Sequence, residues 1–482
     1  MNDKKVIWVL DTPLHQVVLD MQSWKLKKLV AEGSQVDVVI CGTSVGACVL
    51  NPLGLKKICS YCKSKAKIAM SKIEVNLIDI DELPLSVARE NARERSKLNG
   101  YVWNVESVFV SKFRVHLTDK TSRVLKHSYT KLHLAYHSML ESLRTIVRER
   151  KYNEVWTFNE RGINCGAAIE CAKQEGLPYG AFELCGRDYK VTVAYNSSVF
   201  TSQFWSIEYR KLISSTSRKQ VMQGKAFFEA KLRGEWTNDR VYQTPKAVPV
   251  DLQNLGLVDV LFLYSSEDEF AALGESWKRF FSSQEEVCVF VKKNFPGWNI
   301  AVRFHPNQAG IPKNTLKEKI SLLKQNGIRV FEPKSEISSY ELLSNAKVIV
   351  TFGSTIAIEA VYQGRKVVQV DKYLYSDLRI ISQANSYTEL LEFLNNPSKI
   401  TKKRFRALGM GYCWLNYTSE ECDQAYVTEH FLNPKPVELS LYGRVYFKVV
   451  LLVELFLSDR PLNLQEKTRK VVERSWRSLW SK

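Results

Sequence analysis

The chain has 482 residues, enough for about three average domains or for two large α/β domains. Hydrophobic residues make up 45% of it, aromatic residues 11% and charged residues 25%, which excludes disorder, collagen and coiled coil as descriptions of the whole chain. Lys and Arg exceed Asp and Glu by 69 to 51. The formal net charge of +18 favours a polyanionic partner such as nucleic acid, anionic lipid or a phosphorylated substrate.

The N-terminal segment indicates a cytoplasmic chain. Residues 6–10 are five consecutive apolar residues, too few for the core of a signal peptide, and they are predicted to form a first β-strand. No run of about 18 uncharged apolar residues occurs, so the sequence predicts no transmembrane helix.

In the first half of the chain, short apolar runs alternate with amphipathic stretches, which is typical of parallel β-α-β units. The predicted strands are residues 6–10, 36–41, 75–80, 154–158 and 179–184. The predicted helices are residues 14–31, 84–98, 131–150 and 162–175. The stretch 42–71 is predicted to be irregular. We expect one doubly wound, Rossmann-like domain over residues 1–235.

The alternation restarts after a linker, predicted over residues 236–258 from its prolines and its lack of a period. The second set of predicted strands is 258–264, 299–305, 328–332, 347–352 and 366–371. The predicted helices are 270–281, 313–326, 338–345, 355–363 and 387–394. These elements predict a second doubly wound domain over residues 259–400. Two such domains are expected to face each other across a cleft at the carboxyl ends of both sheets.

Residues 401–482 are predicted to form a helical, basic tail. Residues 460–482 carry seven basic and two acidic residues, with Trp476 and Trp480 four positions apart. This pattern favours an amphipathic helix on an anionic membrane surface, and a solvated face is the alternative. Residues 399–406, with five basic residues and no acidic one, form a further cluster.

Ten cysteines occur, and four of them fall within 22 residues: Cys41, Cys48, Cys59 and Cys62. Only the last pair has the C-x2-C spacing that lets two thiolates reach one tetrahedral metal ion, so we expect buried or loop thiols and no bound metal. Asp79 and Asp81 superficially resemble a metal-binding Asp-x-Asp, but no second ligand cluster accompanies them.

Two segments of the second domain indicate a phosphate site. Gly353, Ser354 and Thr355 lie between a predicted strand and a predicted helix, where backbone N–H groups bind anions, and Glu359 follows one helical turn later. The carboxylate of Glu359 is suited to accept hydrogen bonds from ribose hydroxyls. The alternative is that Ser354 only caps the helix while Glu359 points to water.

Arg303 and His305 are two residues apart at the end of a predicted strand, so they are expected on one face of it. A cation beside an imidazole suits a diphosphate or sugar phosphate, and a structural histidine is the alternative. Ser265 and Ser266 follow another strand and could face the same ligand.

In the first domain, carboxylates follow three predicted strands: Asp11, Glu160 and Glu183. A carboxylate at that edge could act as a general base for an acceptor hydroxyl.

Taken together, these residues resemble the bacterial capsule polysaccharide biosynthesis family, glycosyltransferases of the two-domain GT-B fold. The matching pieces are Ser265-Ser266, Arg303-Phe-His-Pro306, Ser338-x-Tyr340-x-Leu-Leu343, Gly353-Ser-Thr355 with Glu359, and Gly364-Arg-Lys-Val-Val368. In the first domain, Asn159-Glu-Arg161 and Glu183-x2-Gly186 resemble the family's Asn-Gly-Arg and Glu-Arg-Gly elements, with Glu160 in place of glycine and Leu184 in place of arginine.

The resemblance implies metal-independent transfer of a sugar from a nucleotide donor, CMP- or UDP-linked, to a growing capsule or O-antigen type glycan. Arg303 and His305 would then hold the donor phosphate, with His305 also acting in catalysis. Ser265, Ser266, Gly353, Ser354 and Thr355 would complete the donor site, and Glu359 would hold the ribose. Glu183 is the first candidate for the catalytic carboxylate, followed by Asp11 and Glu160.

The first domain would bind the acceptor, a glycan or lipid-linked glycan, and the enzyme would lie on the inner face of the plasma membrane. Three alternatives stay open. A polyol-phosphate transferase of the teichoic acid type would also use a His-Pro element and a basic tail. A nucleotide-sugar 2-epimerase shares the fold, but its His-Arg-x-Glu-Asn stretch is missing here. A non-enzymatic nucleic-acid binder is supported only by net charge, so no nucleic-acid partner is expected.

Overall fold

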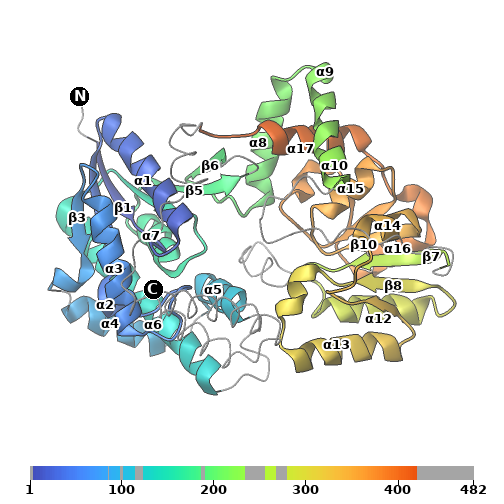
Figure 1. Ribbon diagram of the computed structural model, residues 1–482, viewed down its shortest axis with the longest axis horizontal. Coiled ribbons are helices and arrows are strands. Elements are labelled where there is room, and N and C mark those ends of the chain that lie inside the picture. The colour runs from blue at the N-terminus through green and yellow to red at the C-terminus, as the bar shows by residue number, and fades with distance from the viewer. Residues whose placement is uncertain are drawn as a thin grey trace, which may run out of the picture. The chain divides into compact units, whose positions relative to one another are not determined.

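The computed structural model describes residues 4–84, 86–97, 101–113, 123–185, 190–233, 256–266 and 279–420. These residues form two compact units, each a sheet flanked by helices (Figure 1). Of the described residues, unit 1 holds those up to Leu184, Val191–Val199, and Ser419 with Glu420. Unit 2 holds the described parts of Cys185–Lys190 and Phe200–Thr418.

Unit 1 is built on a six-stranded sheet with the order β3-β2-β1-β4-β5-β6. Its strands are β1 (Lys5–Val9), β2 (Gln35–Ile40), β3 (Asn76–Asp79), β4 (Glu154–Phe158), β5 (Tyr179–Cys185) and β6 (Lys190–Tyr195). The pairs among β1 to β5 are parallel, with Ile7 opposite both Asp37 and Val155. With this strand order, the direction in which successive strands are added changes between β1 and β4, which is the switch point of the sheet.

Helices cover both faces of this sheet. They are α1 (Gln16–Ala31), α2 (Gly42–Val45), α3 (Lys56–Met70), α4 (Ser86–Lys97), α5 (Trp103–Phe113), α6 (Arg123–Arg150) and α7 (Ile163–Gln174), with the 3-10 turn η1 (Ile80–Glu82). Ile7 and Val9 belong to a core with residues of α5, α6 and α7. Trp8 points to the opposite face, where its ring stacks on Trp156, and Lys25 of α1 lies 4.7 Å from the centre of the Trp156 ring.

Unit 2 repeats this strand order. Its sheet runs β12-β11-β10-β7-β8-β9, and every neighbouring pair is parallel. The strands are β7 (Val258–Leu263), β8 (Ile300–Arg303), β9 (Arg329–Phe331), β10 (Ala346–Thr351), β11 (Val367–Val370) and β12 (Ser382–Ala384). The direction of winding changes between β7 and β10.

Two cores, one on each face, hold the helices of unit 2. The α-helices are α8 (Ser202–Ser214), α9 (Arg218–Val221), α10 (Lys225–Leu232), α12 (Gln284–Asn294), α13 (Lys313–Gln325), α14 (Ser339–Ser344), α15 (Ile356–Tyr362), α16 (Tyr387–Asn395) and α17 (Arg404–Asn416). The 3-10 turns are η2 (Met222–Gly224), η5 (Pro306–Gly310), η6 (Ser376–Leu378) and η7 (Pro397–Lys399). Phe262 and Val350 pack with α12, α13 and α16, whereas Leu261 and Ile349 pack with α10, α14, α15 and α17.

The two sheets confirm the prediction of two doubly wound, Rossmann-like units. The predicted strands occur within one or two residues of their expected ends, because runs of buried β-branched and aromatic residues mark them. The prediction that the stretch 42–71 is irregular is wrong where α2 and α3 form. Helix α3 buries only Ile58, Lys65, Ala66 and Met70, so its apolar face is narrow and includes a lysine.

Several predictions lie outside the described residues: most of the linker 236–258, most of the helix 270–281 and residues 421–482 of the tail. The last residues of that predicted helix, 279–281, are described and are not helical. No helix within the described ranges combines the length and the apolar character needed to cross a bilayer.

The first domain is predicted over residues 1–235, whereas α8, α9 and α10, which precede residue 235, belong to unit 2. They pack against α17, and η2 between α9 and α10 approaches the α17 backbone most closely. A Cβ on Gly224 would lie 2.1 Å from the carbonyl oxygen of Leu408. After α17 the chain returns to unit 1, where Glu420 pairs with Lys25 at 2.5 Å and with Lys28 at 2.9 Å.

Candidate functional site

Asp11 lies at the switch point of unit 1, two residues after β1. It is 5% exposed, and its Oδ1 accepts a hydrogen bond from Asn164 Nδ2 at 3.3 Å. A Cβ on Gly162 would lie 3.0 Å from Asp11 Oδ2, so a glycine leaves room for this carboxylate. Burial raises the pKa of Asp11 to about 6, although side-chain hydrogen bonds with Cys165 and Asn164 act in the opposite direction.

Glu160 follows β4 across the same switch point and is 5% exposed. Burial raises its pKa to about 7, with Ser198 opposing the shift. Its Oε1 is buried and has no hydrogen-bond partner among the described residues. Asn104 of α5 fixes the backbone here, because its Nδ2 donates to the carbonyl oxygen of Glu160 at 2.6 Å.

Glu183 lies on β5 and is half-buried. Its charge contributes to the raised pKa of Glu160, and the pKa of the Cys165 thiol is raised by burial and by the charges of both Asp11 and Glu183. The structure therefore brings the three predicted carboxylates to one edge of the unit 1 sheet. A carboxylate with a pKa near neutrality is suited to accept a proton from a hydroxyl.

Sequence reasoning missed a glutamine in each unit that holds the corresponding backbone position. Gln22 of α1 accepts from the Asp11 N–H at 3.0 Å and donates to the Asp11 carbonyl at 2.7 Å. Gln284 of α12 accepts from the Ser265 N–H at 3.0 Å and donates to the Ser265 carbonyl at 3.1 Å. Both glutamines are fully buried, and no motif marks either of them.

Ser265 lies two residues after β7, the position in unit 2 that corresponds to Asp11 in unit 1. Its hydroxyl donates to the carbonyl of Gly353 and so joins the ends of β7 and β10. Gly353 has φ +105°, and a Cβ there would lie 2.4 Å from the Tyr373 ring, so this turn requires glycine. Ser266 is also buried beside it.

The turn between β10 and α15 presents backbone N–H groups. The N–H of Ser354 donates to the Tyr375 hydroxyl at 3.0 Å, which in turn donates to the Ser354 carbonyl. Thr355 is exposed and makes no side-chain cap to α15. Within the described ranges, the N–H groups of Thr355 and Ile356 have no acceptor. Ser354 was expected to present its N–H to a phosphate, but Tyr375 already occupies that group.

Arg303 ends β8 with its side chain buried. Its guanidinium donates to the backbone carbonyls of Glu332 and Ser335, the latter at 3.2 Å, so it braces the loop that leads to α14. Its Nε is buried without a partner among the described residues, and burial lowers its pKa. An anion near Nε would satisfy this donor.

His305 lies beyond the end of β8 and caps η5. Its Nδ1 accepts from the N–H of Asn307 at 3.2 Å, which assigns the proton of the neutral ring to Nε2. The ring is half-buried, so the histidine serves a structural cap and can also present an N–H donor.

Glu359 of α15 is 3% exposed, so the alternative in which it points to water is wrong. One carboxylate oxygen accepts a hydrogen bond from the Tyr340 hydroxyl, and the other lies 4.0 Å from Lys231 Nζ. Two of the motifs that resemble the family therefore meet here. Burial and the charge of Glu359 raise the pKa of Tyr340, so its hydroxyl stays a donor.

The four clustered cysteines are free, half-buried thiols. Cys41, Cys59 and Cys62 line a pocket of unit 1 together with Lys63. Burial raises the pKa of Cys48 to about 12 and that of Cys62 well above its usual range, so both are protonated at neutral pH. The described residues contain no group of three or more ligands arranged to hold a metal ion.

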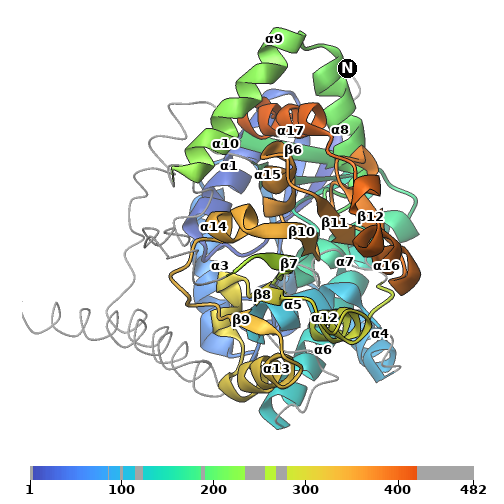
Figure 2. The same ribbon diagram turned by 90° about the vertical axis from the view of Figure 1, so that its right-hand side faces the viewer.

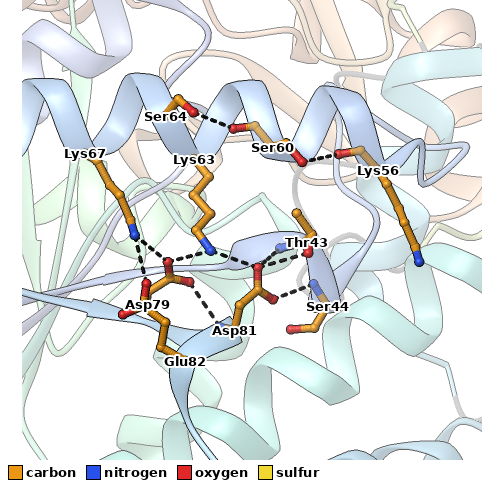
Figure 3. A network of polar contacts seen from close by, with 10 residues as sticks. All are labelled: Thr43, Ser44, Lys56, Ser60, Lys63, Ser64, Lys67, Asp79, Asp81 and Glu82. Atoms are coloured by element: carbon orange, nitrogen blue, oxygen red, sulfur yellow. Dashed lines mark hydrogen bonds and ion pairs between the residues drawn. The ribbon is translucent and has the colours of Figure 1, made fainter.

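Asp79 and Asp81 are engaged by lysines of α3 (Figure 3). Lys63 Nζ lies 2.6 Å from Asp79 and 3.1 Å from Asp81, and Lys67 also reaches Asp79 at 3.0 Å. Burial opposes the charge of Asp81, but backbone N–H donors of Thr43 and Ser44, together with Lys63, outweigh it and lower its pKa. The Asp-x-Asp element thus joins α2, α3 and η1.

No family model matches the chain, and no curated protein sequence matches it. Similar solved structures include the Thermosulfurimonas dismutans KpsC β-Kdo 2,7 transferase, at TM-score 0.34 and 11% identity over 56% of this chain and 80% of that one. Another is the Neisseria meningitidis UDP-GlcNAc 2-epimerase bound to UDP-GlcNAc, at TM-score 0.27 and 12% identity over 85% and 97% of the chains. A third is S. aureus MnaA with UDP, at TM-score 0.29 and 10% identity over 91% and 100%. At these values the likeness carries no argument about activity.

Proposed function

We propose that the protein is a metal-independent glycosyltransferase that moves a sugar from a UDP- or CMP-linked donor to a growing capsule or O-antigen type glycan. The observation that supports this most is the contrast between the two switch points. Unit 1 presents carboxylates whose pKa values are raised toward neutrality, and unit 2 presents N–H donors.

In the proposed reaction, a unit 1 carboxylate takes the proton of the acceptor hydroxyl while the hydroxyl oxygen forms a bond to the anomeric carbon of the donor sugar. The bond from that carbon to the donor phosphate breaks, and the electron pair leaves with the nucleotide. Among the three carboxylates we favour Glu160 over Glu183 as the base. Its pKa of about 7 and its unpartnered Oε1 suit proton transfer near neutral pH.

In unit 2, the leaving phosphate would be stabilised by the N–H groups of Thr355 and Ile356, by Arg303 Nε and by His305, since each donor gains from the developing charge. Glu359 would accept from a ribose hydroxyl alongside Tyr340. The basic segment 460–482 would hold the enzyme at the inner face of the plasma membrane. Ser265, Ser266 and Gly353 would keep the strand ends in register rather than touch the donor.

The deciding experiment is incubation of the protein with a panel of UDP- and CMP-sugars, with and without glycan acceptors, followed by NMR analysis of the products. The proposal predicts release of the nucleotide together with a glycoside or, without acceptor, slow donor hydrolysis. A C2-epimerised donor would instead identify an epimerase. Turnover only of a nucleotide-linked polyol would identify a polyol-phosphate transferase. Stabilisation by any oligonucleotide and by no nucleotide sugar would identify a polyanion binder.

A further inference from the structure

Helix α17 begins in a cluster of cations on unit 2. Lys399 is neutralised, because it lies 2.5 Å from Glu392. Four other cations of this segment pair with no carboxylate among the described residues: Lys402, Lys403, Arg404 and Arg406. Helices α8, α9 and α10 lie against α17 in Figure 2, which brings further surface residues beside this cluster.

Apolar side chains are exposed within the same surface. Phe405 is 44% exposed, and the guanidinium of Arg218 on α9 lies 5.6 Å from the centre of its ring. Met222 is 47% exposed and follows Arg218 by four residues, so the two side chains share a helical face. These cationic and apolar side chains, Lys402, Lys403, Phe405, Arg218 and Met222, form a strip that runs from the start of α17 onto α9 and η2.

We propose that this strip docks unit 2 on an anionic lipid bilayer, with Arg218, Lys402 and Lys403 against the headgroups and Phe405 and Met222 in the interface. The inference depends neither on the proposed sugar transfer nor on residues 460–482.

Two features favour a bilayer as the partner. The pKa of Lys403 is lowered by burial and by the charges of Arg406 and Arg379, so the cations repel one another and lipid phosphates would relieve that repulsion. A soluble polyanion would bind the cations but leave Phe405 and Met222 in water, whereas a membrane interface takes up both kinds of group.

The test is co-sedimentation of the full chain with vesicles of equimolar phosphatidylglycerol and phosphatidylcholine at low salt, with pure phosphatidylcholine vesicles for comparison. Lys402→Gln/Lys403→Gln should weaken binding about 30-fold, because each basic residue near an anionic surface contributes roughly fivefold. Phe405→Ala, which changes no charge, should weaken it roughly tenfold. The matched control is Lys56→Gln/Lys72→Gln in unit 1, two exposed lysines with the same change of charge, and it should bind like the parent.

Lys403 is half-buried and the other substituted side chains are exposed, so circular dichroism is measured to check that each variant is folded. The proposal is wrong if the Lys402/Lys403 variant sediments like the parent, if the control loses as much, or if neutral vesicles bind equally well. It is also wrong if the variant loses affinity for a single-stranded oligonucleotide while vesicle binding persists.

Discussion

Unit 1 and unit 2 share one strand order, and their switch points carry different chemistry. In both units a buried glutamine clamps the backbone two residues after the first strand, at Asp11 and at Ser265. Unit 1 places a carboxylate on that position, with Glu160 across the switch point. Unit 2 places a hydroxyl there and joins it to the Gly353 turn.

The shared scaffold therefore fixes where the side chains project. The residue types at the strand ends, which differ between the two units, decide what those side chains do. Burial is similar at both edges, but its effect depends on the group that is buried. At Asp11 and Glu160 it raises carboxyl pKa values to about 6 and about 7. At Arg303 it leaves the Nε–H without a partner among the described residues.

The largest expected effect is on the unit 1 side of the comparison. Glu160→Gln should lower kcat about 1000-fold, because an amide cannot accept the proton and general base catalysis contributes roughly 10²–10⁴-fold. Steady-state kinetics with the donor found in the product screen measures this. Glu183→Gln is the matched control, and a loss confined to that variant would transfer the role to Glu183.

On the unit 2 side, His305→Ala should lower kcat by roughly 30- to 1000-fold, the scale for removing one donor to developing charge. Because His305 also caps η5, thermal unfolding is measured in parallel. Full turnover in a folded variant would leave His305 with only its structural role.

The glutamine clamps offer a symmetrical test. Gln22→Leu and Gln284→Leu each leave one buried N–H and one buried carbonyl without a hydrogen-bond partner. Each should therefore lower the free energy of unfolding by about 2 kcal/mol or more. Gln174→Leu is the control, since the exposed side chain of Gln174 bonds among the described residues only to Glu170, and the change should alter stability by less than about 0.5 kcal/mol. Denaturant unfolding gives all three values, and a clamp variant as stable as the control would break the comparison.

The pH dependence of activity gives a smaller effect. If Glu160 is the base, kcat/KM falls about tenfold per unit as pH drops below about 7, because only the ionised carboxylate accepts a proton. Folding raises this pKa from 4.5, so protonation favours the folded state, and Glu160 costs stability as pH rises through about 7. Glu160→Gln should remove both pH dependences. If kcat/KM of this variant still falls below about pH 7, another group is the base.

Much of the scaffold could be predicted because each buried parallel strand appears in the sequence as a short run of apolar residues. Asp11, Glu160 and Ser265 could be proposed because they directly follow such runs. Gln22 and Gln284 could not, since their partners are backbone atoms that any residue supplies. The hydrogen bonds from Arg303 to two loop carbonyls could not be predicted from the sequence for the same reason. The assignment of α8 to α10 to unit 2 could not be predicted, because their contact with α17 spans about 180 residues of sequence.

The most direct test of the division between the units is calorimetric titration of UDP and CMP into the parent, Glu160→Gln and Glu359→Ala. We expect Glu160→Gln to bind the nucleotide like the parent while transfer is lost. Glu359→Ala should bind the nucleotide at least about tenfold more weakly, because a hydrogen bond to a charged group is removed. Tyr340→Phe is the control, since it keeps the carboxylate of Glu359, and it should bind the nucleotide within about threefold of the parent. Loss of nucleotide binding in Glu160→Gln, or parental binding in Glu359→Ala, would contradict the account.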